Sequence, residues 1–242
     1  LNHDFVIQRL TGGCLVATLD AGAPIQEGGV PLRYPLGAAA GSSGLSLRVL
    51  TIAAGRHVVP QPRGCDEILY LIEGHGRIHL SGQSHAVDPD CGFYRAVGQP
   101  LDIDNAGHSP MRLASAFVPA NPAAPAQGAG SPVACLADRE AIPTSDRWYR
   151  LIVDASCGSH EVTQFVGGIP PGRAPAHFHH YEEILVILRG EGRLWTGEIS
   201  AELRPGSCVW LPERQMHSTE NTASGELRLL GIFWPAGSPA VR

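Results

Sequence analysis

Two stretches of the sequence decide the fold, HFHHYEE at residues 177–183 and HSTEN at residues 217–221. Side chains on a β-strand alternate between its two faces, so residues an even number of positions apart point the same way. If residues 177–183 are extended, His177, His179 and Glu183 share one face. His217 would reach the same space from a later strand, so the sequence predicts a cluster of three imidazoles and one carboxylate.

This set of donors is typical of a transition-metal site. Imidazole nitrogens with one carboxylate oxygen suit Fe(II), Mn(II), Ni(II), Co(II) or Zn(II), whereas calcium and magnesium favour shells made of oxygen. A six-coordinate ion held by four protein ligands keeps two positions for water, dioxygen or a chelating substrate. We therefore expect one divalent transition metal per chain, with Fe(II) favoured, in a catalytic rather than a structural site.

The spacing around these residues resembles the two motifs of the cupin superfamily. The first motif, G-x5-H-x-H-x3-4-E-x6-G, ends here at Gly190, and the second, G-x5-P-x-G-x2-H-x3-N, runs from Gly206 to Asn221. The resemblance implies a double-sheet jelly-roll barrel with the metal deep inside one mouth. It also carries the role of metal ligand onto four residues of this chain, His177, His179, Glu183 and His217.

Two positions depart from the motifs. Gly172 lies one residue closer to His177 than the first motif asks, and Arg214 stands where the second motif usually has a glycine. Neither position is a ligand, but Arg214 is expected to reshape the rim of the barrel.

An internal repeat appears when the sequence is shifted by 116 positions, because EILYLIEG from Glu67 then falls on EILVILRG from Glu183. The similarity covers residues 45–122 and 161–238. Together with the resemblance, it predicts an all-β fold of two tandem cupin barrels, a bicupin. The expected ranges are 1–120 for an N-terminal barrel with its arm, 121–134 for a Pro/Ala/Gly-rich linker, and 135–242 for a metal-binding C-terminal barrel.

The repeat predicts that the first barrel holds no metal. Gln61, Arg63 and Leu101 stand where the second half has its histidines, and of the four ligand positions only the carboxylate remains, as Glu67. A guanidinium at a ligand position repels a cation, so we expect Arg63 to pair with Glu67. Gln61, Arg63 and Glu67 would then either form a site for a carboxylate or phosphate, or neutralise one another in a structural domain, which we favour.

The residues expected to surround the substrate are mostly apolar or able to orient a polar group. Strand parity does not settle which of them point inward. The candidates for the substrate pocket are Gln164, Arg173, Leu185, Trp195, Trp210 and Arg214.

Composition excludes several classes of function. The formal net charge is −5 and basic residues do not cluster, so we expect no nucleic-acid partner. All 18 basic residues are arginine, and a chain without lysine forms no Schiff base and has no P-loop lysine. No transmembrane run or secretory signal is visible, so we expect no membrane partner. The six cysteines have no C-x-x-C spacing, which suggests free thiols in a cytoplasmic protein.

Three functions remain open for such a fold. The first, which we favour, is a non-haem Fe(II) dioxygenase acting on a small oxygen-chelating substrate, for which an apolar mouth suggests an aromatic group. The second is a metal-dependent isomerase, decarboxylase, lyase or aminohydrolase that uses the ion as a Lewis acid. The third is a non-enzymatic cupin that binds a metal or small ligand. A monomer and a homodimer are both compatible with the sequence.

Overall fold

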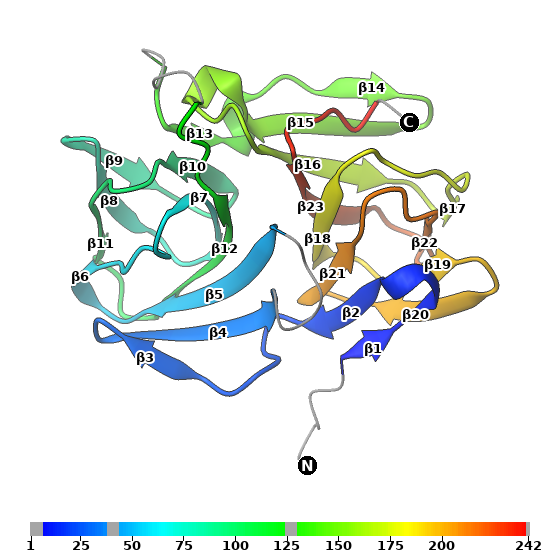
Figure 1. The fold of residues 1–242 in the computed structure, drawn as a ribbon, viewed down its shortest axis with the longest axis horizontal. Coiled ribbons are helices and arrows are strands. Elements are labelled where there is room, and N and C mark those ends of the chain that lie inside the picture. The colour runs from blue at the N-terminus through cyan, green and yellow to red at the C-terminus, as the bar shows by residue number, and fades with distance from the viewer. Residues whose placement is uncertain (1–6, 38–43, 124–129, 241–242) are drawn as a thin grey trace.

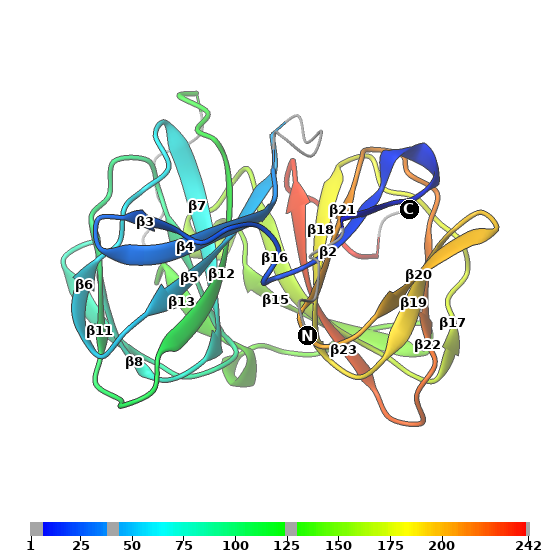
Figure 2. The same cartoon turned by 90° about the horizontal axis from the view of Figure 1, so that it is seen from below.

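The computed structural model describes residues 7–37, 44–123 and 130–240. Its strands form two barrels that lie side by side, as Figure 1 and Figure 2 show from two directions. The helices among the described residues are short 3-10 turns at Thr11–Gly13, Leu136–Asp138 and Ala155–Cys157. The expected all-β, two-barrel architecture is therefore confirmed.

The first barrel consists of a seven-stranded sheet, in the order β13-β10-β7-β12-β5-β4-β3, and a four-stranded sheet, in the order β6-β11-β8-β9. All neighbouring strands are antiparallel. The strands are β3 (Ile25–Glu27), β4 (Val30–Leu36), β5 (Ser46–Ile52), β6 (Gly55–Val58), β7 (Cys65–Glu73), β8 (Gly76–Leu80), β9 (Gln83–Val87), β10 (Cys91–Arg95), β11 (Leu101–Asn105), β12 (Met111–Pro119) and β13 (Val133–Cys135).

The second barrel repeats this plan with an eight-stranded sheet, in the order β1-β2-β21-β18-β23-β16-β15-β14, and a four-stranded sheet, in the order β17-β22-β19-β20. Its strands are β1 (Gln8–Arg9), β2 (Leu15–Thr18), β14 (Ile142–Thr144), β15 (Arg147–Val153), β16 (Thr163–Ile169), β17 (Gly172–Arg173), β18 (Glu182–Arg189), β19 (Gly192–Thr196), β20 (Ile199–Leu203), β21 (Ser207–Leu211), β22 (Ser218–Asn221) and β23 (Leu227–Trp234).

Strand pairing crosses the ranges expected from the sequence. At the start of the chain, β2 pairs with β21 of the second barrel, with Leu15 opposite Trp210. Conversely, β13 follows the expected range of the first barrel in the sequence but pairs with β10 of that barrel. The N-terminal arm therefore completes the second barrel, and residues 133–135 complete the first (Figure 1).

Both large sheets are buried on their two faces. On β7, Leu69 belongs to the core inside the first barrel, whereas Tyr70 belongs to a core shared by both barrels. On β18, Leu185 lies inside the second barrel and Val186 in the shared core. This accounts for the nearly continuous apolar runs of these strands, which a sheet buried on both faces requires.

The structure corrects the register of the repeat in its early strands. On β12, Leu113 lies opposite Leu50, and on β23, Leu229 lies opposite Gly167. Leu113 and Leu229 differ by 116 positions, but Leu50 and Gly167 differ by 117. The 116-residue shift therefore does not hold in the strands before the histidines, where the two halves are related by 117 positions.

The gap lies just before the histidines. Gly55 pairs with Asn105 and Gly172 pairs with Asn221, so these two glycines occupy equivalent positions. The first half has five residues between Gly55 and Gln61, whereas the second has four residues in the equivalent segment. One residue is thus missing from the second half, which explains the short first motif. A loop absorbs such a deletion without disturbing strand parity.

Two cysteines depart from the expectation of free thiols. Cys91 and Cys135 form a disulfide that joins β10 to β13. The pairing of these strands places the two residues directly opposite each other. They lie 44 positions apart in the sequence, so their spacing gave no sign of this contact. The remaining cysteines are free. No helix within the described ranges combines the length and apolar character needed to cross a membrane.

Candidate metal site

Three short segments bring the candidate ligands together at one end of the second barrel. His177 and His217 face each other across an isolated antiparallel bridge, in which each backbone N–H donates to the other residue's carbonyl at 2.9 Å. His179 follows two positions later, and Glu183 lies in β18. The structure thus brings the four side chains together, although residues 178–181 do not form the continuous strand that the parity argument assumed.

The three histidines are close enough to share one ion, and Glu183 lies beside two of them. One ring nitrogen from each of His177, His179 and His217 lies within 4.8 Å of the others. Glu183 Oε2 is 3.9 Å from His179 Nε2 and 3.6 Å from His217 Nε2. A metal at their centre would draw these atoms to bonding distances of about 2 Å.

Backbone carbonyls orient two of the rings. The Nδ1 atom of His177 is 3.1 Å from the Pro175 carbonyl oxygen, and that of His217 is 2.9 Å from the Gln215 carbonyl oxygen. Since a carbonyl only accepts, each Nδ1 must carry the proton, and the lone pair of each ring lies on Nε2. This arrangement fixes the tautomer that a metal ligand needs.

The protonation of the clustered side chains and the buried oxygen of Glu183 are those expected of a cation-binding site. Burial raises the pKa of Glu183 to about 8, and its Oε2 is buried without a hydrogen-bond partner. Burial, followed by the nearby His177, lowers the pKa of His217 to about 3, so this imidazole is neutral. A buried carboxylate oxygen without a partner is unfavourable unless a cation or donor meets it. The donor set therefore fits a divalent transition metal.

A cavity of about 90 Å³ opens beside the four side chains. Its walls come from the strands of the large sheet and from the β14–β15 hairpin. Aromatic and aliphatic groups dominate, so the cavity is small and mostly apolar. Its lining comprises Thr144, Arg147, Trp148, Tyr149, Phe165, Gly167, Gly168, Ile169, His177, His179, Glu183, Leu185, His217, Thr219, Leu229, Phe233 and Pro239.

Of the six residues expected to surround the substrate, Leu185 lines this cavity. Gln164 and Trp210 lie elsewhere. A side chain at Gly92 of the first barrel would collide with Gln164, so Gln164 lies between the barrels. Trp210 packs in the shared core and donates to Glu182 at 3.2 Å. Both lie on sheet faces that point away from the metal cluster.

The other three expected pocket residues lie on the outside. The Arg173 guanidinium stacks over Trp195 at 4.2 Å, and Trp195 donates to Glu220 at 2.7 Å. Arg214 is exposed and adopts a left-handed conformation with φ of 60°. This conformation explains why the motif usually has glycine at that position. The prediction that these residues line the pocket is not supported, because Arg173 and Trp195 pack on each other away from the cavity and Arg214 lies in an exposed turn.

Sequence reasoning missed the β14–β15 hairpin as a source of pocket residues. Thr144, Arg147 and Tyr149 all come from it. The signal for it is the stretch DRWYR at residues 146–150, which by itself indicates no more than an arm of the second barrel. Only the fold shows that the arm covers the cavity.

An ion-paired cluster fills the first barrel where the second has its histidines. Glu67 is fully buried between Arg48, whose Nε is 3.1 Å from Oε1, and Arg95, whose Nη1 is 3.2 Å from Oε2. Ser115 also donates to Glu67. The expected pairing of Glu67 with Arg63 is therefore wrong.

Local structure explains this correction. Arg63 occupies an exposed turn before β7, which keeps it away from the barrel interior. The Gln61 amide donates to the Ala96 carbonyl and accepts from the Gly98 N–H, each at 2.8 Å. The structure therefore does not assemble Gln61, Arg63 and Glu67 into the anion site considered above.

The two barrels differ most in the charges around their shared carboxylate. By strand pairing, the first barrel places two cations and a hydroxyl around Glu67, whereas the second places apolar groups and a glycine around Glu183. The equivalent pairs are Arg48 and Phe165, Arg95 and Leu211, and Ser115 and Gly231. Glu183 therefore lacks the counter-charges that Glu67 has.

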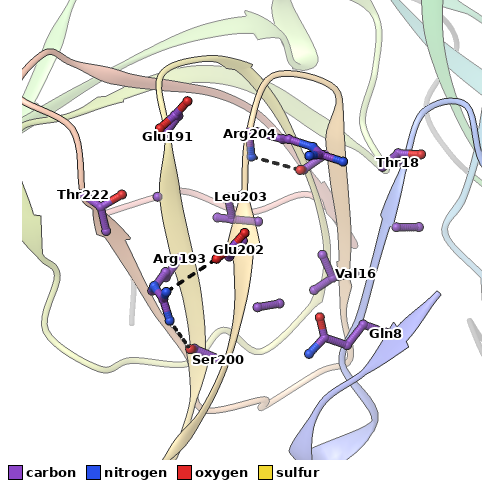
Figure 3. A pocket seen from close by; sticks show the side chains of 14 residues that line it. Gln8, Val16, Thr18, Glu191, Arg193, Ser200, Glu202, Leu203, Arg204 and Thr222 are labelled. Carbon is purple, nitrogen blue, oxygen red and sulfur yellow. Dashed lines mark hydrogen bonds and ion pairs between the residues drawn. The ribbon is translucent and has the colours of Figure 1, made fainter. Parts of the chain in front are cut away.

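A larger groove of about 890 Å³ lies outside the second barrel, between β1–β2 and β19–β20 (Figure 3). Arg193 Nη2 is 3.6 Å from Glu202 Oε1, and Arg193 Nη1 donates to Ser200 at 3.4 Å. The dashed lines in Figure 3 show these pairings. The groove is wide, polar and partly self-neutralised, and the four clustered side chains do not line it. We therefore place the candidate site in the smaller cavity.

Comparisons with known proteins agree with this fold. Residues 165–233 match the family model "Cupin domain". A protein from Pseudomonas aeruginosa named as glyoxylate-induced matches with a TM-score of 0.78 and 17% identity, over 98% of this chain and 94% of that one. The chain has the fold of a bicupin. The protein Ylba from E. coli matches this chain with a TM-score of 0.76 and 14% identity, over 97% of this chain and 95% of that one.

Another neighbour is a mutant of oxalate decarboxylase from Bacillus subtilis. Its TM-score is 0.72 at 15% identity, over 96% of this chain and 78% of the mutant chain. A search of curated proteins found no match. Among the residues that the structure describes, His177, His179 and His217 form a group that could hold a metal ion, and this group lies in the second barrel.

Proposed function

We propose that this bicupin is a metal-dependent enzyme, and specifically a non-haem Fe(II) dioxygenase that acts on a small oxygen-chelating substrate. One observation supports the presence of a metal. Glu183 is buried beside three histidines and has no arginine partner, whereas the equivalent Glu67 forms ion pairs with two arginines. A protein of the same fold, the Bacillus subtilis oxalate decarboxylase, is described as having Mn(II) centres.

The lining of the cavity supports oxygen chemistry over acid–base chemistry. Apart from the four clustered side chains, its described titratable residues are Arg147 and Tyr149. Neither is a carboxylate or an imidazole, the side chains that most often act as a general base. A lyase or aminohydrolase needs such a group to move protons. A bound ferrous ion would itself supply the activation of dioxygen and the chelation of substrate.

The side chains of the barrel would then position the ion and the substrate and keep water away from them. The three histidines and Glu183 would hold the ion, and the cavity beside them would admit the substrate. Phe165 and Phe233 pack with their ring centroids 4.9 Å apart and exclude water from that side. The cavity of about 90 Å³ favours a compact substrate.

Metal analysis tests the first part of this proposal. We expect about one transition metal per chain, lost in His177→Ala and His217→Ala. Gln61→Ala is the matched control, because Gln61 is the first-barrel equivalent of His177 and should leave the metal content unchanged. Two metals per chain would contradict a metal-free first barrel.

Oxygen consumption tests the reaction. With Fe(II) bound, a set of small chelating substrates should include one whose addition consumes dioxygen. Turnover without oxygen, with Mn(II) or Zn(II) in place of iron, would instead support Lewis-acid chemistry. Absence of turnover with any metal would favour a binding protein.

A further inference from the structure

The disulfide of the first barrel lies at a pocket between the two barrels. Cys91 on β10 and Cys135 on β13 both line this pocket of about 430 Å³, and residues of β15 and β23 form its other wall. Cys91 is 3% exposed, whereas Cys135 is half-buried. Exposed disulfides are the labile ones, because a thiolate must reach a sulfur atom to break the bond. The pocket therefore gives small molecules access to this disulfide from the Cys135 side.

The second barrel holds its equivalent strand without a disulfide. Ser207 lies 116 positions after Cys91, and it faces Thr18 on β2 as Cys91 faces Cys135 on β13. The fold thus does not require a covalent link at this position. β2 pairs with a strand on each side, β21 and β1, whereas β13 has three residues and forms the edge of its sheet. A short edge strand opens easily once such a link is broken.

The segment after β13 contacts a strand that lines the cavity beside the histidines. The Leu136 N–H donates to the Asp90 carbonyl at 2.9 Å, and the Leu136 carbonyl accepts from Arg150 Nη1 at 2.8 Å. Arg150 lies on β15 next to Tyr149, which lines that cavity. Trp148 lines both the cavity and the pocket with the disulfide. A displacement of β13 would therefore reach the wall of the cavity.

The charges that line the pocket with the disulfide cancel. Arg150 and Arg228 come from the second barrel, and Asp88 and Asp90 precede β10 of the first barrel. Two cations and two anions give no net field that would repel a small thiol of either charge. A guanidinium near a sulfur atom also stabilises the thiolate form, which is the form that attacks and leaves in disulfide exchange.

We propose that Cys91–Cys135 is a redox-active disulfide that exchanges with a low-molecular-weight thiol, and that the mixed disulfide forms on Cys135. Opening of the bond releases β13 from β10 and loosens β15 at the wall of the cavity. The first barrel thus contains a redox-sensitive element at a position where the second barrel has Ser207 and Thr18.

The exchange proceeds in two steps. The thiolate of the small molecule attacks Sγ of Cys135, the S–S bond breaks, and the bonding pair leaves on Sγ of Cys91, which takes a proton from water. A second small thiolate then attacks the sulfur of the first one, which releases a small-molecule disulfide and leaves Cys135 as a thiol after protonation. Two small thiols are oxidised and the protein disulfide is reduced.

Reaction of the folded protein with glutathione tests access to the disulfide. Cys65→Ser is the background, because Cys65 is a half-buried free thiol that would also react, whereas the free Cys14, Cys157 and Cys208 are buried. After acid quenching, mass spectrometry should find the glutathione adduct on Cys135. We expect the disulfide to be lost at least about tenfold faster than the protein unfolds under the same conditions. Loss at the rate of global unfolding, or an adduct on Cys91 alone, would overturn the inference.

Hydrogen exchange tests the structural consequence. After reduction, amides in residues 133–136 should exchange roughly tenfold faster or more, and amides in residues 147–151 should also lose protection. The matched control is β2, Leu15–Thr18, whose exchange should change by less than about twofold because it has no disulfide to lose. Unchanged protection of β13 would show that the disulfide does not secure this strand. Unchanged protection of β15 would show that opening does not reach the cavity.

A double variant repeats the test without a thiol. Cys91→Ser with Cys135→Thr installs the pair found in the second barrel, and its β13 should exchange as in the reduced wild type and not respond to glutathione. The measurement on the reduced wild type decides the inference if this variant fails to fold. None of these experiments needs a bound metal, so their outcome is independent of the proposed function.

Discussion

Glu67 and Glu183 hold equivalent positions in the two barrels, but Glu67 is surrounded by cations and Glu183 is not. Glu67 bonds two buried arginines and Ser115, so its charge is necessary to balance theirs. Glu183 has an Oε2 atom without a hydrogen-bond partner and three neutral or titratable rings beside it. The same substitution should therefore have different consequences at the two sites.

We expect Glu67→Gln to lower the free energy of unfolding by roughly 3–5 kcal/mol, because it leaves buried guanidinium groups without compensation. Glu183→Gln should change the free energy of unfolding of the metal-free protein by less than about 1 kcal/mol, since no hydrogen bond to Oε2 is lost. Urea denaturation of the metal-free variants measures both. Equal losses would contradict the contrast between the barrels. Only Glu183→Gln should reduce metal content.

At the scale of elements, the N-terminal strand β2 is a structural part of the second barrel. Leu15 lies opposite Trp210, is 1% exposed and packs in the shared core. The segment before β2 also contacts the loop that carries His217, because a side chain at Gly12 would collide with Gln215. An element more than 190 positions away in sequence therefore supports the metal loop.

We expect Leu15→Ala to destabilise the protein by roughly 2–5 kcal/mol, the usual cost of emptying a buried leucine site. Ile25→Ala is the control, because Ile25 is also on an early strand but is 43% exposed. Its effect should be within about 0.5–1 kcal/mol. Thermal or urea denaturation compares the two variants. A negligible effect of Leu15→Ala would show that β2 does not contribute to the barrel.

At the scale of the whole molecule, the two barrels share one core. Residues from both large sheets, such as Tyr70 and Val186, belong to the same buried cluster. The N-terminal arm and β13 also exchange between the halves, since each pairs with the barrel that the other half of the sequence forms. Such shared burial couples the stability of the barrels.

Tryptophan fluorescence can test this coupling, because all four tryptophans lie in the second half, at residues 148, 195, 210 and 234. Leu50→Ala empties a fully buried site inside the first barrel and should cost about 2–5 kcal/mol. We expect the fluorescence transition in urea to shift as far as the transition followed by circular dichroism. A fluorescence midpoint that stays at the wild-type value would mean that the barrels unfold independently.

Strand parity predicted the cluster of His177, His179, Glu183 and His217, and the internal repeat with the resemblance to the cupin motifs predicted the all-β class and the two barrels. Both are local properties, so they can be read along the chain. The surroundings of that cluster depend on tertiary structure. Arg48 reaches Glu67 across 19 positions, and the arginine of the β14–β15 hairpin meets a cavity whose histidines lie 30 or more positions away. Which side chains converge there depends on how strands pair across the barrel, and sequence order does not encode that pairing directly.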